Sequence, residues 1–162
     1  MRGNGLALAR WIALLLPVAL MAGALGSQYI GGLVPCEMCV WQRWPHYAAI
    51  VVALLAFVVQ GNVMRAALTL LAGALIAVSG AIGVFHAGVE YHWWQGITAC
   101  TSGFRPAASS ADMLAQIMNA PVVRCDAPQW TLFGISLAGF NAIFSIAGAI
   151  LIFALVGRRK RA

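Results

Sequence analysis

The chain has 162 residues, of which 62% are hydrophobic and 9% are charged, and its formal net charge is +6. Because an ordinary soluble domain carries about 25% charged residues, this composition excludes a typical soluble globular protein. Four stretches contain no acidic or basic residue, and each exceeds the roughly 20 residues that a helix needs to cross a bilayer. They are Trp11–Leu33, Trp44–Met64, Ala66–Val89 and Ala127–Gly157.

These stretches predict an all-α integral membrane protein, a four-helix transmembrane bundle in a single domain that covers residues 1–162. They lack the alternating pattern that barrel strands require. The first stretch resembles a signal peptide in its basic start, but its apolar run continues to Ile30, so we interpret it as a transmembrane helix. Spans are expected at about 11–31, 45–62, 66–87 and 131–157, and two periplasmic loops at about 32–44 and 88–130.

The first loop contains the sequence PCEMCVWQRWPHY, which begins at Pro35 and includes a C-x-x-C pair, Cys36 and Cys39. If Pro35 begins a helix, both cysteines share a face with Arg43. The helix dipole and the guanidinium then both lower the pKa of the thiols. If the helix instead begins at Pro45, the pair lies in an irregular turn and only the effect of Arg43 persists. The sequence leaves both arrangements open.

The second loop is the longer one and holds the other two cysteines, Cys100 and Cys125, with the segment SSADMLAQIM between them. Ser110 is expected to cap a short surface helix in this segment, with Asp112 in its first turn. The apolar face of this helix lies on the bilayer surface or packs against its own loop, and the sequence does not choose between the two. That face consists of Met113, Leu114, Ile117 and Met118.

Basic residues are distributed unevenly between the two ends of the predicted bundle. With four spans, both termini and the short loop at 60–65 share one side, which carries seven basic residues and no acid. The positive-inside rule therefore predicts cytoplasmic termini, periplasmic cysteines and a bacterial inner membrane. The basic tail then indicates orientation and not nucleic-acid binding. The seven basic residues are Arg2, Arg10, Arg65, Arg158, Arg159, Lys160 and Arg161, and the other side has Arg43, Arg105 and Arg124.

Four cysteines that face an oxidising compartment are typical of disulfides. A purely structural role stays open, and so does half of a zinc site, although no second C-x-x-C or histidine pair follows. A c-type haem would need a histidine at the position of Val40. If the disulfides exchange electrons, the chain of exchanges needs a final acceptor, and a lipid-soluble quinone reaches the depth of the C-x-x-C pair.

Several other side chains near the first cysteine pair are candidate ligand-binding residues. Arg43 lies at the head of a predicted span, where a charge is unfavourable unless it binds an anionic ligand or a lipid head group. Trp41 either stacks on a bound ring or anchors the helix at the membrane interface. His46 and His86, at the outer ends of spans, are candidates for passing protons to a bound acceptor. No metal site is predicted.

The chain resembles the bacterial disulfide-bond formation protein B (DsbB) family over about residues 6–157. The resemblance is carried by P-C-x-x-C-x-x-x-R from Pro35, four predicted spans, two cysteines in the second outer loop, and CDAPQWTLFG from Cys125. It implies an enzyme, a protein-dithiol:quinone oxidoreductase that sustains disulfide-bond formation. The implied partners are a periplasmic thioredoxin-fold thiol oxidase (DsbA-like), the lipid bilayer and a membrane quinone, which is ubiquinone or menaquinone.

The resemblance also implies a catalytic role for each cysteine. Cys100 forms a mixed disulfide with the partner oxidase. Cys125 is then released and attacks Cys36, and Cys39 becomes the thiolate that contacts the quinone. Arg43 supports quinone binding in this scheme. The segment SSADMLAQIM matches a surface-lying helix that lets the second loop move towards the first.

The chain departs from the family pattern at two places. Gln42 stands where some members carry an acid, and the histidine expected near the quinone is either His86 or His92. Two rival interpretations stay open as well. One is a membrane scaffold with purely structural disulfides. The other is a vitamin-K-epoxide-reductase-like oxidoreductase, although in that family the C-x-x-C follows the loop cysteines in chain order, whereas in this chain it precedes them.

Overall fold

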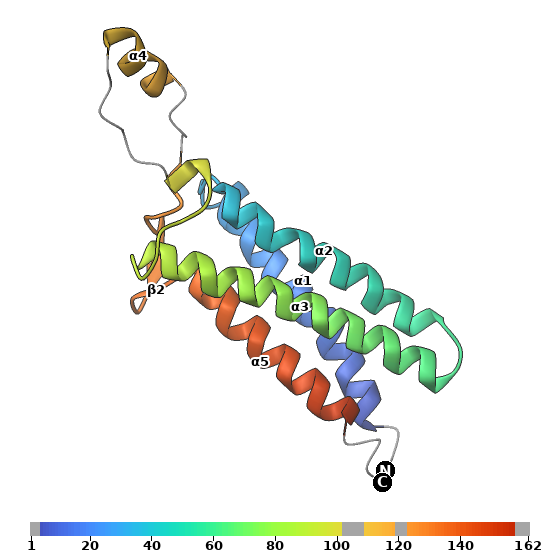
Figure 1. Cartoon of the computed structure of the whole chain (residues 1–162). Coiled ribbons are helices and arrows are strands. Elements are labelled where there is room, and N and C mark those ends of the chain that lie inside the picture. Colours follow the sequence, from blue (N-terminus) through green and yellow to red (C-terminus); the bar gives the residue numbers. More distant parts are fainter. Residues whose placement is uncertain (1–3, 102–108, 119–122, 158–162) are drawn as a thin grey trace.

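The computed structural model describes residues 4–101, 109–118 and 123–157. Within these residues the fold is helical, apart from a two-stranded hairpin and one 3-10 turn. Four long helices, α1, α2, α3 and α5, form a bundle in which α2 and α5 each pack against α1 and α3, and α1 also contacts α3 (Figure 1). The elements are α1 Asn4–Tyr29, α2 Glu37–Val58, α3 Asn62–Glu90, η1 Ala99–Thr101, α4 Ser110–Met118, β1 Thr131–Leu132, β2 Ile135–Ser136 and α5 Leu137–Gly157.

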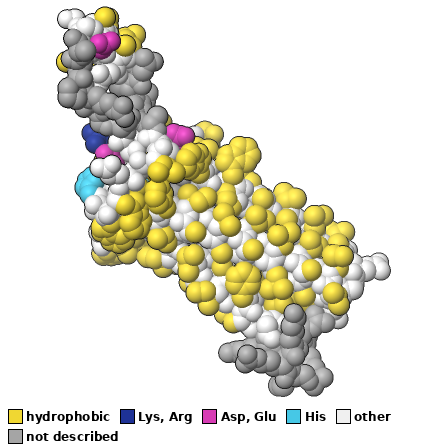
Figure 2. All heavy atoms as spheres, in the orientation of Figure 1, with side chains coloured by type: hydrophobic (Ala, Val, Ile, Leu, Met, Phe, Trp, Pro, Cys, Tyr) yellow, Lys and Arg dark blue, Asp and Glu magenta, His cyan; other side chains and the backbone are white. Residues whose placement is uncertain are grey.

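Three helices are long and apolar enough to cross a membrane. They are Gly5–Tyr29 within α1, all of α3 and all of α5. Helix α2 is not among them, because polar side chains such as Gln42 and Arg43 in its first half lower its mean hydropathy. The all-helical fold is therefore confirmed, whereas the fourth span at 45–62 stays a prediction. Figure 2 shows that hydrophobic side chains cover most of the visible face of the bundle.

Helix α2 begins at Glu37, well before the predicted start of the second span at 45. Cys36 is its N-cap residue, with an extended backbone conformation (φ −76°, ψ 170°), and Pro45 lies inside the helix. Of the two arrangements that the sequence left open, the structure therefore has the continuous helix. Pro45 removes one internal hydrogen bond, which bundled membrane helices tolerate.

A tight hairpin leads into α5, which starts at Leu137, later than the predicted 131. Phe133 (φ 51°) and Gly134 (φ 77°) form its turn with positive φ angles, as two-residue hairpins require. The hydroxyl of Tyr91, at the end of α3, donates to the carbonyl of Gly134 and accepts from the backbone N–H of Ser136. These two bonds fix the start of α5 against the end of α3.

Small residues allow α3 and α5 to approach closely. A Cβ atom on Gly83 would lie 3.0 Å from the backbone nitrogen of Ala142 and 3.1 Å from the carbonyl oxygen of Ala138. Close approach at glycine is a common way for membrane helices to associate, because packing replaces the hydrophobic driving force that lipid does not supply. This contact positions the polar side chains of both helices described below.

We expect Gly83→Leu to destabilise the bundle by about 1–3 kcal/mol, because the new side chain would meet the backbone of α5 and the hydrogen-bonded side chain of Asn141. Thermal unfolding of the purified protein in detergent should show a midpoint several degrees lower. Gly26→Ala is the matched control, since nothing lies within 4 Å of a Cβ at that position of α1. An equal loss in both variants would mean that close packing of α3 on α5 is not the cause.

The two ends of the bundle differ in composition. At one end Leu6, Ala9 and Val156 form a buried cluster that joins the start of α1 to the end of α5. Both cysteine pairs lie at the other end, so the described parts of the termini are opposite the cysteines. The orientation in a membrane stays a prediction. Several residues on which it depends lie outside the described residues, namely Arg2, Arg105, Arg158, Arg159, Lys160 and Arg161.

The predicted surface helix is present as α4, and Figure 1 shows it set apart from the bundle. Its first turn is capped by Ser109, whose hydroxyl accepts from the backbone N–H of Asp112 at 3.1 Å. The prediction that Ser110 is the cap is therefore wrong by one residue. None of the residues of α4 is buried, so its apolar face is uncovered in this structure.

Candidate active site

The C-x-x-C pair lies at the N-terminus of α2, where Cys36 and Cys39 form a disulfide. Cys36 is buried, with 4% of its surface exposed, and its Sγ accepts from the backbone N–H of Cys39 at 3.2 Å. The sulfur thus occupies the position of an N-cap oxygen and satisfies one of the free N–H groups of the first turn. When the pair is reduced, this position stabilises a thiolate on Cys36.

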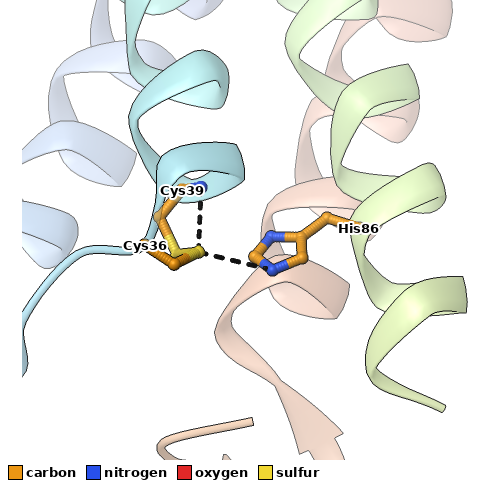
Figure 3. A group of neighbouring side chains, drawn as sticks. All are labelled: Cys36, Cys39 and His86. Carbon is orange, nitrogen blue, oxygen red and sulfur yellow. Dashed lines mark hydrogen bonds between the residues drawn. A yellow bond between two sulfur atoms is a disulfide. The ribbon is translucent and has the colours of Figure 1, made fainter. Parts of the chain in front are cut away.

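His86 reaches the same sulfur from α3 (Figure 3). Its Nε2 lies 3.5 Å from the Sγ of Cys36. Gln42 determines which ring nitrogen carries the proton. The side-chain nitrogen of Gln42 lies 3.2 Å from the carbonyl oxygen of Met38, which can only accept, and 2.8 Å from Nδ1 of His86. Nδ1 therefore accepts, the neutral ring carries its proton on Nε2, and Nε2–H points at Cys36.

Glu90 is a buried acid one turn after His86 on α3. Its Oε1 lies 3.7 Å from Nε2 of His86, and its Oε2 has no hydrogen-bond partner among the described residues. The carboxyl group thus lies near the Nε2 proton, just beyond hydrogen-bond distance in this structure. Glu90 was not predicted as a site residue from the sequence. The available signal was its position, because it is the acid that ends the third apolar stretch.

The second pair, Cys100 and Cys125, is also disulfide-bonded, with a Cα–Cα distance of 5.4 Å. Both disulfides belong to one buried cluster, in which Cys36, Cys100 and Cys125 pack with Met38 and Val89. The fold therefore brings the cysteines of the two loops together, although 60 or more residues separate them in the chain. The hydroxyl of Thr98 lies 2.9 Å from the Sγ of Cys100.

An exposed ion pair flanks the second disulfide. The guanidinium of Arg124 donates two hydrogen bonds, of 2.8 and 2.6 Å, to the carboxylate of Asp126, the residue after Cys125. These bonds hold the pKa of the Asp126 carboxyl below its usual range. At neutral pH the pair therefore stays ionised and holds the backbone on either side of Cys125.

A cavity of about 400 Å³ opens beside the C-x-x-C pair, between α1, α2, α3 and α5. Most of its lining is apolar, with Leu20, Phe140 and Phe144 among its walls. Its polar lining side chains include Gln42, Arg43, His46, His86 and Glu90, next to both Cys36 and Cys39.

Arg43 crosses from α2 to α1 at the edge of this cavity. It donates to the side-chain oxygen of Gln28 and, at 3.4 Å, to the carbonyl oxygen of Ala24. No carboxylate among the described residues forms an ion pair with Arg43. Its positive charge is therefore held by neutral acceptors and is free to interact with a ligand in the cavity.

Only some of the predicted site residues line the cavity. Cys36, Cys39, Arg43 and His86 line the cavity, whereas Cys100 and Cys125 pack in one cluster with Cys36 and do not line it. Trp41 is not among the lining residues and is 38% exposed, so its role in ligand binding stays a prediction. Of the two histidines at the end of α3, His86 is at the disulfide, whereas His92 is exposed in the following turn with φ 59°.

The ligand atoms of Cys36, Cys39 and His86 lie within 4.8 Å of one another, a spacing that suits a metal ion. Zinc binds cysteine as the thiolate. The two sulfurs are joined in a disulfide in this structure. A zinc site would therefore require the reduced pair.

Comparison with known proteins gives a consistent result. The family model for disulfide bond formation protein DsbB matches residues 7–155. Disulfide bond formation protein B of Verminephrobacter eiseniae is 32% identical, with 90% of this chain and 85% of that protein covered. Disulfide bond formation protein B 1 of Pseudomonas fluorescens is 30% identical, with coverage of 90% and 86%.

A third relative, disulfide bond formation protein B of a Polaromonas species, is 28% identical, with 89% of this chain and 86% of that protein covered. No solved structure is significantly similar to the chain. The family model spans nearly all of the described helices and both cysteine pairs. The chain therefore belongs to the DsbB family of disulfide-forming membrane proteins.

Proposed function

We propose that this protein reoxidises a periplasmic thioredoxin-fold thiol oxidase of the DsbA kind and passes the electrons to a membrane quinone, ubiquinone or menaquinone. The observation that carries the proposal is the pair of disulfides in one buried cluster, of which the first, and not the second, lines the cavity described above. The first disulfide is thus in reach of a small ligand, and the second is packed against the first, in position for thiol–disulfide exchange with it. A purely structural role does not explain that arrangement.

The cavity suits a quinone ring by size and by chemistry. Its volume of about 400 Å³ falls within the range of small-molecule sites, and its walls are mainly apolar. Three of the four helices around it, α1, α3 and α5, are candidate membrane spans, which suits a ligand dissolved in lipid. A quinone bound there supplies an acceptor for two electrons and two protons.

Electrons enter at the second disulfide in this proposal. A thiolate of the partner attacks Cys100, the Cys100–Cys125 bond breaks, and Cys125 leaves as a thiolate. Cys125 then attacks the buried sulfur of Cys36, the Cys36–Cys39 bond breaks, and Cys39 leaves as a thiolate. The partner's second thiol attacks its mixed disulfide, so the partner is released in the oxidised form and Cys100 is free.

The first pair ends the sequence reduced. Cys100 attacks Cys125, the second disulfide re-forms, and Cys36 is released as a thiolate, which the backbone N–H of Cys39 and the Nε2–H of His86 both stabilise. Re-formation of the Cys36–Cys39 bond then delivers two electrons and two protons to the quinone. Arg43, held beside the cavity without a carboxylate partner, attracts the negative charge that develops there.

We infer a bacterial inner-membrane location with four spans, cytoplasmic termini and both cysteine pairs in the periplasm. The excess of basic residues on the terminal side of the sequence supports this topology. The position of both disulfides at the bundle end opposite Leu6 and Val156 is consistent with it.

The decisive experiment mixes the purified protein with a reduced thioredoxin-fold oxidase and decyl-ubiquinone, with a menaquinone analogue in a parallel reaction. We expect one quinol, measured by ultraviolet absorbance, for each disulfide formed in the partner. Omission of the protein is the control for direct reaction. A redox titration distinguishes the scaffold alternative. Structural disulfides typically have reduction potentials below about −300 mV, so they stay oxidised at less negative potentials, where catalytic disulfides are already reduced. Such resistance together with absence of quinol would refute the proposal.

A further inference from the structure

His46 lies on α2, about one turn after Gln42 and Arg43, and its hydrogen bonds determine which ring nitrogen carries the proton. The side-chain nitrogen of Asn141, on α5, lies 3.2 Å from the carbonyl oxygen of Ser79, a group that can only accept. The side-chain oxygen of Asn141 must therefore face the other way, where it lies 2.9 Å from Nε2 of His46. An amide oxygen only accepts, so Nε2 of His46 carries the proton.

Nδ1 of His46 is consequently a bare acceptor when the ring is neutral. This atom is buried and has no partner among the described residues, while the whole side chain is only 3% exposed. His46 nevertheless lines the cavity beside the first disulfide. A buried acceptor without a partner is unfavourable, and where it borders a cavity a ligand can satisfy it.

The position of His46 fits the second oxygen of a ring bound in that cavity. Arg43 and His46 are three residues apart on α2, so they share a face and are separated by about 4.5 Å along the helix axis. A quinone or quinol has oxygens on opposite sides of its ring. With one oxygen near Arg43 and Cys39, the other is directed along α2 towards His46.

We propose that Nδ1 of His46 accepts a hydrogen bond from a hydroxyl of the bound quinol, so that the cavity binds the reduced ring more tightly than the oxidised one. This inference rests on the proposed function. A bare acceptor discriminates in this direction, because a quinol hydroxyl donates whereas a quinone carbonyl offers a second acceptor and leaves Nδ1 unpaired.

Tighter binding of the quinol has a consequence for the electron acceptor. Each tenfold preference for the reduced ring raises the potential of the bound two-electron couple by about 30 mV. His46 thereby makes the bound ring a stronger oxidant than the same ring free in lipid. The higher potential of the bound ring favours electron flow from the C-x-x-C pair to the ring. This matters because the proposed partner, which supplies the electrons, is itself strongly oxidising and so donates them only to an acceptor of high potential.

The test measures binding and not turnover. In the full-length Cys36→Ala/Cys39→Ala variant, which cannot exchange electrons through the first pair, dissociation constants for decyl-ubiquinol and decyl-ubiquinone are measured by tryptophan fluorescence under anaerobic conditions. We expect His46→Leu to weaken quinol binding about tenfold or more, as for one buried hydrogen bond. Quinone binding should change less than about threefold.

Ser145→Ala is the matched control, because Ser145 contacts Asn141 and His46 within the same polar group but does not line the cavity. Both affinities should change less than about threefold. His46→Asn, which can offer an amide oxygen near the position of Nδ1, should recover part of the quinol affinity. Equal effects of His46→Leu on both ligands would overturn the inference.

A spectroscopic measurement avoids substitution of His46 altogether. In protein with 15N-labelled histidine, the Nδ1 signal of His46 should shift on addition of decyl-ubiquinol and stay in place with decylbenzene, which has no hydroxyl. If quinol binds and this signal does not move, His46 is not the acceptor, while the proposed function stands. If neither ring binds at all, the proposed function itself fails.

Discussion

Cys39→Ser should abolish quinol formation with reduced partner and decyl-ubiquinone. Without the sulfur of Cys39, no first disulfide exists to receive electrons from Cys125, and none can re-form to pass them to the quinone. The rate should fall to that of the reaction without protein. The Cys100–Cys125 disulfide is untouched, so the variant should still form a mixed disulfide with the partner, visible as a larger species on a non-reducing gel.

Cys36→Ser is the matched variant for this result. Serine is a preferred N-cap residue, so its hydroxyl can replace the sulfur that accepts from the backbone N–H of Cys39, and the start of α2 should be retained. Both serine variants should therefore fold and both should be inactive. Turnover that persists in Cys39→Ser would show that the assignment of Cys39 is wrong.

The cysteine chemistry was accessible from the sequence for a physical reason. Charge-free stretches of helical length determine where the chain can cross a bilayer, and the loops between them then contain all four cysteines. The pairing of neighbours at C-x-x-C spacing needs no knowledge of tertiary structure. The pairing of Cys100 with Cys125 came from the family resemblance, and the structure has that disulfide.

The polar contacts between helices could not be predicted in the same way. Gln42 meets His86 and Asn141 across 44 and 99 positions of sequence, and such meetings depend on how each helix is rotated about its axis. Apolar helices with small residues on several faces give little indication of that rotation. From the sequence, Gln42 is notable only as the residue that replaces an acid, whereas in the structure its amide determines the tautomer of His86.

The helix starts could not be predicted exactly from the sequence where two residues suited the same position equally well. Pro35 and Pro45 are both acceptable first residues of a helix. The structure decides for the earlier start, because Cys36 has an extended backbone and its sulfur caps the first turn of α2. Ser109 and Ser110 are equally good caps by residue type, and the structure uses the first. In both cases the alternatives differ by contacts that composition does not encode.

Arg43→Ala should reduce the rate at limiting quinone by roughly ten- to a hundredfold, as expected for loss of a charged hydrogen-bond donor worth about 1.5–3 kcal/mol. At saturating quinone the loss should be smaller, because the cysteines are unchanged. The measurement is the dependence of initial rate on decyl-ubiquinone concentration. Gln28→Ala is the control, because it removes the acceptor on α1 but keeps the guanidinium charge beside the cavity.

Arg43→Lys separates ligand binding from lipid anchoring. A lysine ammonium serves a lipid head group as well as a guanidinium does, so under the anchor interpretation the lysine variant behaves like the unsubstituted protein. If Arg43 binds the ring, lysine recovers only part of the rate, because its point charge does not reproduce the planar, multiple donors of arginine. Unchanged kinetics at limiting quinone in Arg43→Ala would exclude a role in ligand binding. Arg43 would then be an anchor that happens to border the cavity.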